Sequence, residues 1–485
     1  MKISFIVPVY NKDIETVKRS VGSLVRQSHK DKEIIVVFDG PQPSVEQALK
    51  TEFKSLIYKT IEHEGACAAR NSGYAEATGD IISFWDADCV AEPEMSATWL
   101  KYIAYYKVDF VYSGYKWDNP DVPGFASERF DPFTLSKYNY ISSMGACKKE
   151  FVAEWDTSLK GLQDWDYWRQ VVKAGAKGYH IPGFGFTTAL SKEGDISHTT
   201  RKDIESRLKS IRKKWKDPVC DTLVISNTYH FQAVEFAKVL GADYFSNLAY
   251  YKLHNYKTLF SVGLDAENPF QSMFFMQDKK ATRKVIYWMG MDIDHFLNSA
   301  YETVKTLLEQ LKVNKIAHFC DDKQGKDKLK RLGIDAEIAP MPVQNHAFAT
   351  PELPAEFKIL AFADEHYAPL LNSIKKALPN LKWELVVPDK RYQLADYTVN
   401  VQFSKDKRFI AGLRNMLLAG RHVISTVQEP FCGYVSTDQG VKEFKAEVIN
   451  KLLTLAKKPA INAPAIEYYR KQTNPETFRK TVGGV

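Results

Sequence analysis

The chain has 485 residues, of which 45% are apolar and 13% aromatic, and its formal net charge is +7. This length and composition predict about two to four packed domains and exclude a disordered polymer. The charge is too small to require an anionic partner such as nucleic acid, although it permits one.

Cysteine usage and hydropathy indicate the compartment of the protein. The six cysteines are scattered, with no CxxC pair and no zinc-type spacing, as expected of reduced thiols. The N-terminal apolar stretch is too short for the core of a signal peptide, and no apolar run approaches the roughly 18 residues of a membrane span. We therefore expect a cytoplasmic protein with no transmembrane segment.

The N-terminal part of the chain alternates between strand and helix patterns. Asp13 is expected to cap a helix whose apolar residues recur at helical spacing, and residues 67–79 predict a second helix closed by Gly79. Because apolar strands separated by helices are typical of parallel sheets, we expect an α/β domain with a mainly parallel sheet covered on both faces. Its strands are predicted at ISFIVPVY (3–10), KEIIVVFDG (32–40), SLIYKTIE (55–62) and DIISFWDAD (80–88).

Three aspartates follow predicted strands directly. Asp39 ends the second strand, and Asp86 and Asp88 end the fourth. In parallel α/β sheets, ligands bind beyond the carboxyl ends of the strands, so these three carboxylates are expected at one edge. The Asp-Ala-Asp sequence is either a polar turn that ends the strand or a site for a divalent cation.

Four segments identify a family resemblance. VPVYNK, EIIVVFDG, GACAARNSGYAEATGDIISFWDADC and GLQDWDYWRQVVKAGAKGYHIP occur in an order and spacing similar to those of family 2 glycosyltransferases. The resemblance covers roughly residues 1–200. It implies a GT-A fold that binds a nucleotide diphosphate sugar as donor, with UDP-sugar favoured.

The resemblance implies that Asp88 binds Mn²⁺ or Mg²⁺ directly and that Asp86 binds the ribose or the metal with its water. The chemistry agrees, because a departing diphosphate concentrates negative charge that a divalent cation neutralises. Hard cations take oxygen ligands, typically one or two carboxylates together with phosphate oxygens and water.

The donor base is expected beside Asp39, which matches the second aspartate of the family motif Asp-Asp-Gly-Ser. Phe38 and Pro41 depart from that motif, and the identity of the base stays open. Pro8 and Tyr10 would flank the base. Arg70 would support the nucleotide diphosphate site, and its alternative role is a structural ion pair.

The resemblance implies that Asp164 is the general base, although Gln163 replaces the glutamate that usually precedes it. A base that activates the acceptor hydroxyl opposite the departing diphosphate gives inversion. Asp164 is alternatively a helix N-cap, and Asp166 is expected to be structural. A family histidine that serves as a further metal ligand is absent from its usual place; His198 is the nearest candidate, with Lys192 as an alternative cation for the diphosphate.

Residues 201–220 predict a basic linker helix. It is either a solvated helix packed by its apolar stripe or a contact for phosphate or nucleic acid. Residues 221–345 and 346–485 predict two Rossmann-like lobes, the second with a C-terminal tail, and faintly resemble a GT-B glycosyltransferase lobe. The usual donor-binding glutamates are replaced by Lys407 and Asn415. This region is therefore expected to be a non-catalytic lobe that binds acceptor, partner or a second copy of the chain, and a second active transferase is the alternative.

These observations favour a metal-dependent, inverting hexosyl- or pentosyltransferase acting on a hydroxyl of a glycan. Two alternatives stay open: transfer to a hydroxylated base in DNA, and a non-catalytic scaffold that binds carbohydrate or nucleotide. A nucleotidyltransferase is disfavoured because VPVYNKDIET lacks a glycine-rich phosphate loop.

Overall fold

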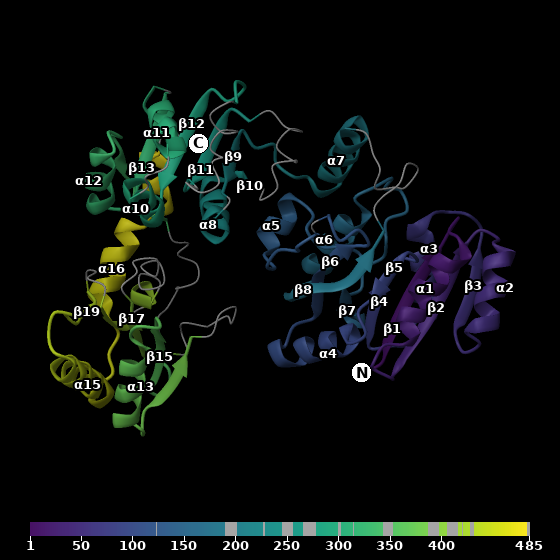
Figure 1. Ribbon diagram of the computed structural model, residues 1–485, viewed down its shortest axis with the longest axis horizontal. Helices are drawn as coiled ribbons and strands as arrows, with labels where there is room; N and C mark the ends of the chain where they lie inside the picture. Colours follow the sequence, from purple (N-terminus) through teal and green to yellow (C-terminus); the bar gives the residue numbers. More distant parts are fainter. Residues whose placement is uncertain are drawn as a thin grey trace. The chain divides into compact units, whose positions relative to one another are not determined.

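The computed structural model describes residues 1–122, 124–189, 201–226, 228–244, 256–264, 278–298, 302–313, 315–342, 353–386, 397–404, 416–419, 421–426 and 431–482. The chain divides into two compact units, the first comprising Met1–Val219 and the second beginning at Cys220 (Figure 1). Both units are α/β structures, which confirms the predicted fold class. None of the helices in the described ranges is both long and apolar enough to cross a membrane.

The first unit is built around one mixed sheet with the strand order β3-β2-β1-β4-β7-β6-β8-β5. Its strands are β1 (Ile3–Val9), β2 (Lys32–Asp39), β3 (Ile57–Ile61), β4 (Ile81–Phe84), β5 (Cys89–Ala91), β6 (Phe110–Trp117), β7 (Ala146–Lys148) and β8 (Gly178–Thr188). Its helices are α1 (Ile14–Val25), α2 (Pro43–Glu52), α3 (Ala66–Glu76), α4 (Met95–Tyr106), α5 (Pro132–Lys137), α6 (Gln163–Lys173) and α7 (Arg201–Trp215), with a short 3₁₀ helix at Lys149–Phe151.

The predicted parallel arrangement is confirmed for one half of this sheet. Strand β1 pairs in parallel with β2 and β4, and β2 pairs in parallel with β3. The other half is mixed, because β7 is antiparallel to β4 and β6, and β5 is antiparallel to β8. The carboxyl ends of β1, β2, β3 and β4 therefore share one edge, where Asp39 ends β2 and where Tyr10, Asp86 and Asp88 follow β1 and β4.

Helices cover both faces of the parallel half. Asp13 caps α1 as predicted, since its side chain accepts a hydrogen bond from the backbone nitrogen of Thr16 at 2.9 Å. The buried residues of α1 pack with Phe5 on one face of β1. Helix α3 covers the opposite face so closely that a Cβ at Gly73 would lie 2.5 Å from Cγ2 of Ile6. Glycine at this position lets α3 approach the sheet and bring its side chains to the edge.

The second unit contains two parallel sheets. The first has the order β10-β9-β11-β12-β13-β14. Its strands are β9 (Thr222–Ile225), β10 (Asp243–Tyr244), β11 (Thr258–Val262), β12 (Arg283–Trp288), β13 (Ile316–Cys320) and β14 (Glu337–Ile338). Its helices are α8 (His230–Leu240), α10 (Gly290–Asn298), α11 (Glu302–Val313) and α12 (Lys323–Arg331).

The other sheet of this unit has the order β16-β15-β17-β18-β19. Its strands are β15 (Lys358–Ala363), β16 (Lys382–Leu385), β17 (Val399–Phe403), β18 (His422–Ser425) and β19 (Gly433–Tyr434), and the helices that follow β15 and β19 are α13 (Ala368–Ala377), α15 (Val441–Lys457), α16 (Ala463–Gln472) and α17 (Pro475–Thr481). In both sheets the second strand of the sequence pairs with one side of the first strand, and the third strand pairs with its other side. This is the strand order of doubly wound, Rossmann-like folds. The Rossmann-like prediction is confirmed for both sheets.

Candidate active site

The Asp-Ala-Asp turn lies between β4 and β5, directly after the buried side chain of Trp85. The indole nitrogen of Trp85 donates hydrogen bonds to the hydroxyl of Ser20 at 3.3 Å and to the carbonyl oxygen of Cys89 at 3.1 Å. These bonds fix the backbone of the turn. The side chains of Asp86 and Asp88 remain 35% and 27% exposed, so both carboxylates are accessible to a ligand.

Each carboxylate of this turn is paired with a cation from another element. Arg70 on α3 donates to Oδ1 of Asp86 at 2.8 Å, and the hydroxyl of Ser143 donates to its Oδ2 at 3.3 Å. Lys12, in the loop after β1, donates to Oδ2 of Asp88 at 2.8 Å. Lys12 was not predicted as a site residue, although its position just after a strand end was a usable signal.

The donor set of the turn suits a hard divalent cation. Asp86 and Asp88 offer accessible carboxylate oxygens, which Mg²⁺ and Mn²⁺ prefer. Among the described residues, no group of three or more His, Cys, Asp or Glu side chains gathers into a metal site. Two carboxylates fit a cation that shares its remaining coordination positions with diphosphate and water, and they do not fit an all-protein metal cage.

Asp39 ends β2 and is almost completely buried, with 2% of its side chain exposed. Its Oδ1 accepts from the backbone nitrogen of Glu64 at 2.8 Å, and Gly65 N–H reaches both oxygens at 3.1 and 3.0 Å. Nδ1 of His63 lies 3.0 Å from Oδ2. His63 follows β3 at the same sheet edge and is a second residue that was not predicted from the sequence.

The loop after β1 places the ring of Tyr10 against the ring of His63. The side chain of Gln42 accepts a hydrogen bond from the backbone nitrogen of Asn11 at 3.0 Å and donates one to the carbonyl oxygen of Val9 at 2.8 Å. The ring of Tyr10, a residue that is 51% exposed, stacks on the ring of His63 with centroids 4.0 Å apart. Pro8 is half-buried within β1. Tyr10 and Asp39 thus lie close together, linked through His63.

Arg70 is held in place by an aromatic ring as well as by Asp86. Its guanidinium carbon lies 4.3 Å from the centroid of the Trp155 ring, and Arg70 is 7% exposed. Next to it, the side chain of Asn71 hydrogen-bonds both the backbone nitrogen (2.8 Å) and the carbonyl oxygen (2.9 Å) of Trp155. The structural ion pair weighed for Arg70 is present, and its partner is one of the candidate ligand-binding carboxylates.

Asp164 lies in the first turn of α6. The residue that caps this helix is Leu162, in the left-handed region at φ 56°, so the alternative of Asp164 as the N-cap is wrong. Its Oδ1 accepts from the backbone nitrogen of Trp165 at 2.9 Å, and its Oδ2 accepts from the amide of Asn139 at 2.8 Å. The sequence offered no local signal for Asn139.

Burial raises the pKa of Asp164 above its ordinary value, and the hydrogen bond from Trp165 N–H, the positive charge of Arg70 and the amide of Asn139 offset part of that rise. The charge of Asp86 acts in the same direction as burial. Asp164 therefore lies within electrostatic reach of Arg70 and Asp86. A carboxylate whose pKa is raised toward neutrality is a better proton acceptor than an ordinary surface carboxylate.

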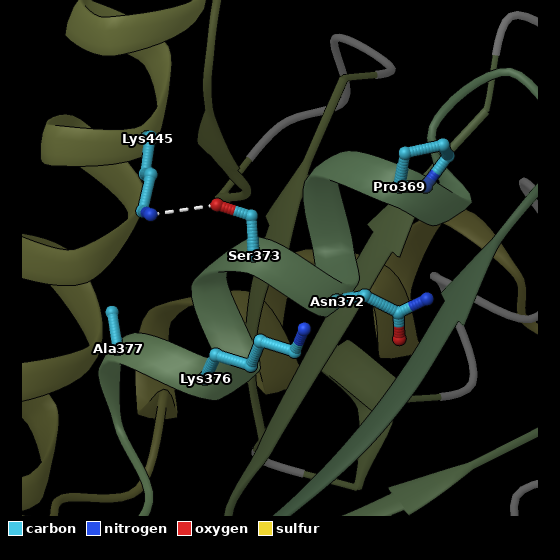
Figure 2. Close-up of a pocket in the computed structure, with 6 residues that line it drawn as sticks. All are labelled: Pro369, Asn372, Ser373, Lys376, Ala377 and Lys445. Carbon is cyan, nitrogen blue, oxygen red and sulfur yellow. Dashed lines mark hydrogen bonds between the residues drawn. The ribbon is translucent and has the colours of Figure 1, made fainter.

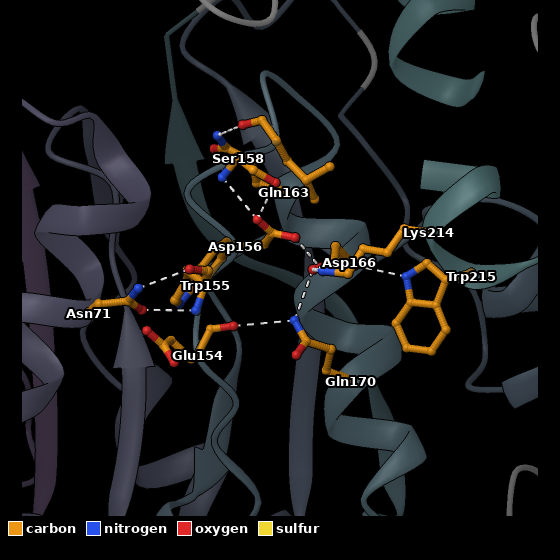
Figure 3. A network of polar contacts seen from close by, with 11 residues as sticks. Asn71, Glu154, Trp155, Asp156, Ser158, Gln163, Asp166, Gln170, Lys214 and Trp215 are labelled. Atoms are coloured by element: carbon orange, nitrogen blue, oxygen red, sulfur yellow. Dashed lines mark hydrogen bonds and ion pairs between the residues drawn. The ribbon is translucent and has the colours of Figure 1, made fainter. Parts of the chain in front are cut away.

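Asp166 is occupied by structural contacts, as expected. It is 1% exposed and accepts hydrogen bonds from Lys214 and from Trp215 Nε1, both at 2.8 Å, and from Gln170 at 2.8 Å. Figure 3 shows this network, in which Lys214 also contacts Asp156. The network fastens the helix that carries Asp164 to α7.

Helix α7 packs against the first unit through its apolar stripe. Leu208 and Ile211 are buried, and beyond the helix Asp217 forms a bidentate pair with Arg169 of α6, with distances of 2.8 and 2.5 Å. The predicted packing of this basic helix by its stripe is confirmed. Its Lys214 is committed to aspartates within the unit, which reduces the charge left for an external anion.

His198 and Lys192 lie outside the described residues, as do Lys407 and Asn415. In the second unit, a pocket of about 400 Å³ lies on α13 and α15, where Lys445 donates to the hydroxyl of Ser373 (Figure 2). Its lining contains no carboxylate and no aromatic ring, so it resembles neither a metal site nor a base-binding site. Its lining residues are Pro369, Asn372, Ser373, Lys376, Ala377 and Lys445.

Curated proteins that are similar to part of this chain include two glycosyltransferases. The glycosyltransferase AglE of Haloferax volcanii is 29% identical over 165 residues, which are 31% of this chain and 54% of that protein. The glycosyltransferase GlyA of Streptococcus pneumoniae is 32% identical over 118 residues, 24% of this chain and 17% of that protein. The match therefore spans about half of the length of the first relative and less than a fifth of the second.

Solved structures with partial similarity include S. aureus TarS 1–349 in complex with UDP-GlcNAc, which is 17% identical with a TM-score of 0.38 and is matched over 45% of this chain and 67% of that one. The mannosyltransferase PcManGT of Pyrobaculum calidifontis, in complex with GDP-Man and Mn²⁺, is 18% identical with a TM-score of 0.36, over 45% of this chain and 65% of that one. Residues 4–151 match the family model of Glycosyl transferase family 2. The family model confirms the resemblance drawn from the motifs, and residues 4–151 of the first unit are similar to family 2 glycosyltransferases.

Proposed function

We propose that the first unit is an inverting, metal-dependent glycosyltransferase that moves a sugar from a nucleotide diphosphate sugar, with UDP-sugar favoured, to a hydroxyl of a glycan. The observation that carries the proposal is the placement of the carboxylates. Asp39, Asp86 and Asp88 follow strands that end at one sheet edge, and Asp164 lies within electrostatic reach of Asp86.

In this proposal, the donor lies along the carboxyl ends of β1, β2 and β4. Asp39 accepts a hydrogen bond from the base, and Pro8 and Tyr10 flank the base. Asp86 binds the ribose or the cation, and Asp88 binds the cation directly. Bound Mn²⁺ or Mg²⁺ would neutralise charge on the departing diphosphate. Lys12 and Arg70, which contact these carboxylates, add fixed positive charge at the same place.

Asp164 accepts the proton of the acceptor hydroxyl. Its orientation is set by the Asn139 amide and by the backbone nitrogen of Trp165, which hold one oxygen each. The first turn of a helix also favours the ionised carboxylate. Because one base acts opposite one leaving group, the proposed transfer inverts the configuration at the sugar carbon.

A donor screen tests this proposal. Thermal shift in the presence of Mn²⁺ should show stabilisation by one nucleotide sugar, because a ligand that binds only the folded state raises the unfolding temperature. The selected donor is then incubated with glycan acceptors and the released nucleotide diphosphate is measured. Wild type should release it, and Asp164→Asn should bind the donor without releasing it. Absence of stabilisation by any nucleotide sugar would overturn the proposal.

A further inference from the structure

The carboxylate of Asp39, which is proposed to bind the donor base, is inaccessible to a ligand in this structure. Asp39 has 2% of its side chain exposed, whereas a base that donates to it must reach one of its oxygens. Three N–H groups already surround it, two from the backbone of Glu64 and Gly65 and one ring nitrogen of His63. The backbone donors are fixed at the start of α3. His63, whose side chain is 52% exposed, is the partner that has room to move.

The contacts of His63 reproduce those expected of a bound base. Its ring is planar, lies 4.0 Å from the Tyr10 ring at an interplanar angle of 9°, and places a nitrogen 3.0 Å from Oδ2 of Asp39. A pyrimidine base that stacks on Tyr10 and donates an N–H to Asp39 makes the same two contacts. The His63 ring and the base therefore cannot make these two contacts at the same time.

We propose that His63 occupies the donor-base position in the nucleotide-free protein and must leave it when the nucleotide binds. This inference rests on the proposed function, because it takes the incoming ring to be the base of a nucleotide diphosphate. His63 is thereby a residue that sets donor affinity, through the free energy required to displace it. When the nucleotide binds, Tyr10 and Asp39 exchange their contacts with His63 for contacts with the base.

Surrounding residues allow such a movement. Gly40, at φ +95°, lies beside His63, and a Cβ there would approach the His63 Cβ to 3.4 Å. The next glycine, Gly65, is at φ +94° with nothing within 4 Å of its Cβ position. His63 thus lies in the short connection between β3 and α3, with Gly40 beside it in space and Gly65 two positions after it in the chain.

The test follows the His63 ring directly. Imidazole proton resonances are recorded by NMR during titration with UDP, with Mg²⁺ rather than paramagnetic Mn²⁺. The His63→Ala spectrum identifies the resonance of His63. Stacking on Tyr10 gives this resonance a ring-current shift, and UDP should abolish that shift. His29, which lies elsewhere on the first unit and contacts the carbonyl oxygen of Met1, should not respond.

Affinity gives a second readout. His63→Ala should bind UDP about fivefold more tightly than wild type, the factor that corresponds to ~1 kcal/mol. His63→Phe keeps an aromatic ring on Tyr10 but loses the contact with Asp39, so it should bind UDP less tightly than His63→Ala. The inference is overturned if UDP binds while the His63 resonance keeps its shift, if His63→Ala binds UDP more weakly, or if His63→Phe matches His63→Ala. Failure of UDP to bind both wild type and His63→Ala would instead overturn the uridine donor on which the inference rests.

Discussion

Lys12 and Asp88 are 76 positions apart in the sequence, yet the ammonium of Lys12 donates a 2.8 Å hydrogen bond to Oδ2 of Asp88. The strand pairing of β1 with β4 explains this contact, because both residues follow the carboxyl ends of neighbouring parallel strands. The carboxylate that is proposed to bind a divalent cation is therefore paired with the ammonium group of Lys12 in this structure.

Replacing this lysine should strengthen metal binding slightly. In Lys12→Met, the cation no longer competes for Asp88, so the affinity for Mn²⁺ should rise. Both side chains are about one-third exposed, and such ion pairs contribute ~0.2–1 kcal/mol, so the gain should not exceed about fivefold. Titration of Mn²⁺ followed by electron paramagnetic resonance measures it. Lys12→Arg is the matched control and should remain near wild type; weaker binding in Lys12→Met would show that Lys12 assists the metal.

Asp164→Asn should separate activity from stability. Loss of the general base should lower kcat by about 10²–10⁴-fold. The fold should not suffer, because burial raises the pKa of Asp164 and the ionised form is the unfavourable one in the folded protein. A raised pKa means that the stabilising contribution is present at low pH and is lost as pH rises through the folded-state pKa. The unfolding temperature of Asp164→Asn at neutral pH should thus equal or exceed that of wild type.

The pH profile of wild type supplies a separate check on the same carboxyl. A base acts only when ionised, so kcat/KM should fall as pH is lowered through the pKa of Asp164. That inflection should lie above 3.8, the ordinary value for this group. A profile with no acidic limb down to that pH would assign the base role to another group.

Protonation of Asp156 should account for part of the loss of stability of the first unit at low pH. The hydrogen bond from Lys214, with help from Ser158, lowers the pKa of Asp156 from 3.8 to about 2. Because the folded-state value is depressed, this contribution is present above pH 3.8 and is lost as pH falls from 3.8 towards about 2. Acid titration followed by circular dichroism should show a shallower loss of stability in Asp156→Asn. Glu154→Gln, an exposed change in the same segment, should leave the curve unchanged.

In the second unit, α17 should matter for the stability of a sheet that is distant in sequence. Phe478 is 3% exposed and its ring lies 5.2 Å from Phe236 and 6.1 Å from Tyr287. Phe478→Ala should cost about 3–5 kcal/mol, as expected of a buried aromatic ring. Hydrogen exchange should become faster in β11 and β12, while the first unit is unaffected. Tyr468→Ala, at a 37% exposed aromatic on α16, is the control and should change exchange little.

Local patterns were sufficient to predict much of both the fold and the site. Continuous apolar runs predicted β1 to β4, and the polar residues that end them, Asp39, Asp86 and Asp88, lie at one edge because parallel strands end together. Periodicity also predicted α1 and its cap at Asp13.

The sequence by itself determined which carboxylates are available and in what order the elements carry them, because hydrophobic period and strand-end chemistry are properties of neighbouring residues. Only the tertiary structure decided which side chain faces which carboxylate: Lys12 at Asp88, Arg70 at Asp86, His63 at Asp39 and Asn139 at Asp164. These pairings depend on strand order, on the register of the sheet and on how closely α3 approaches it. Such distances arise from packing between segments far apart in the chain, and no local pattern specifies them.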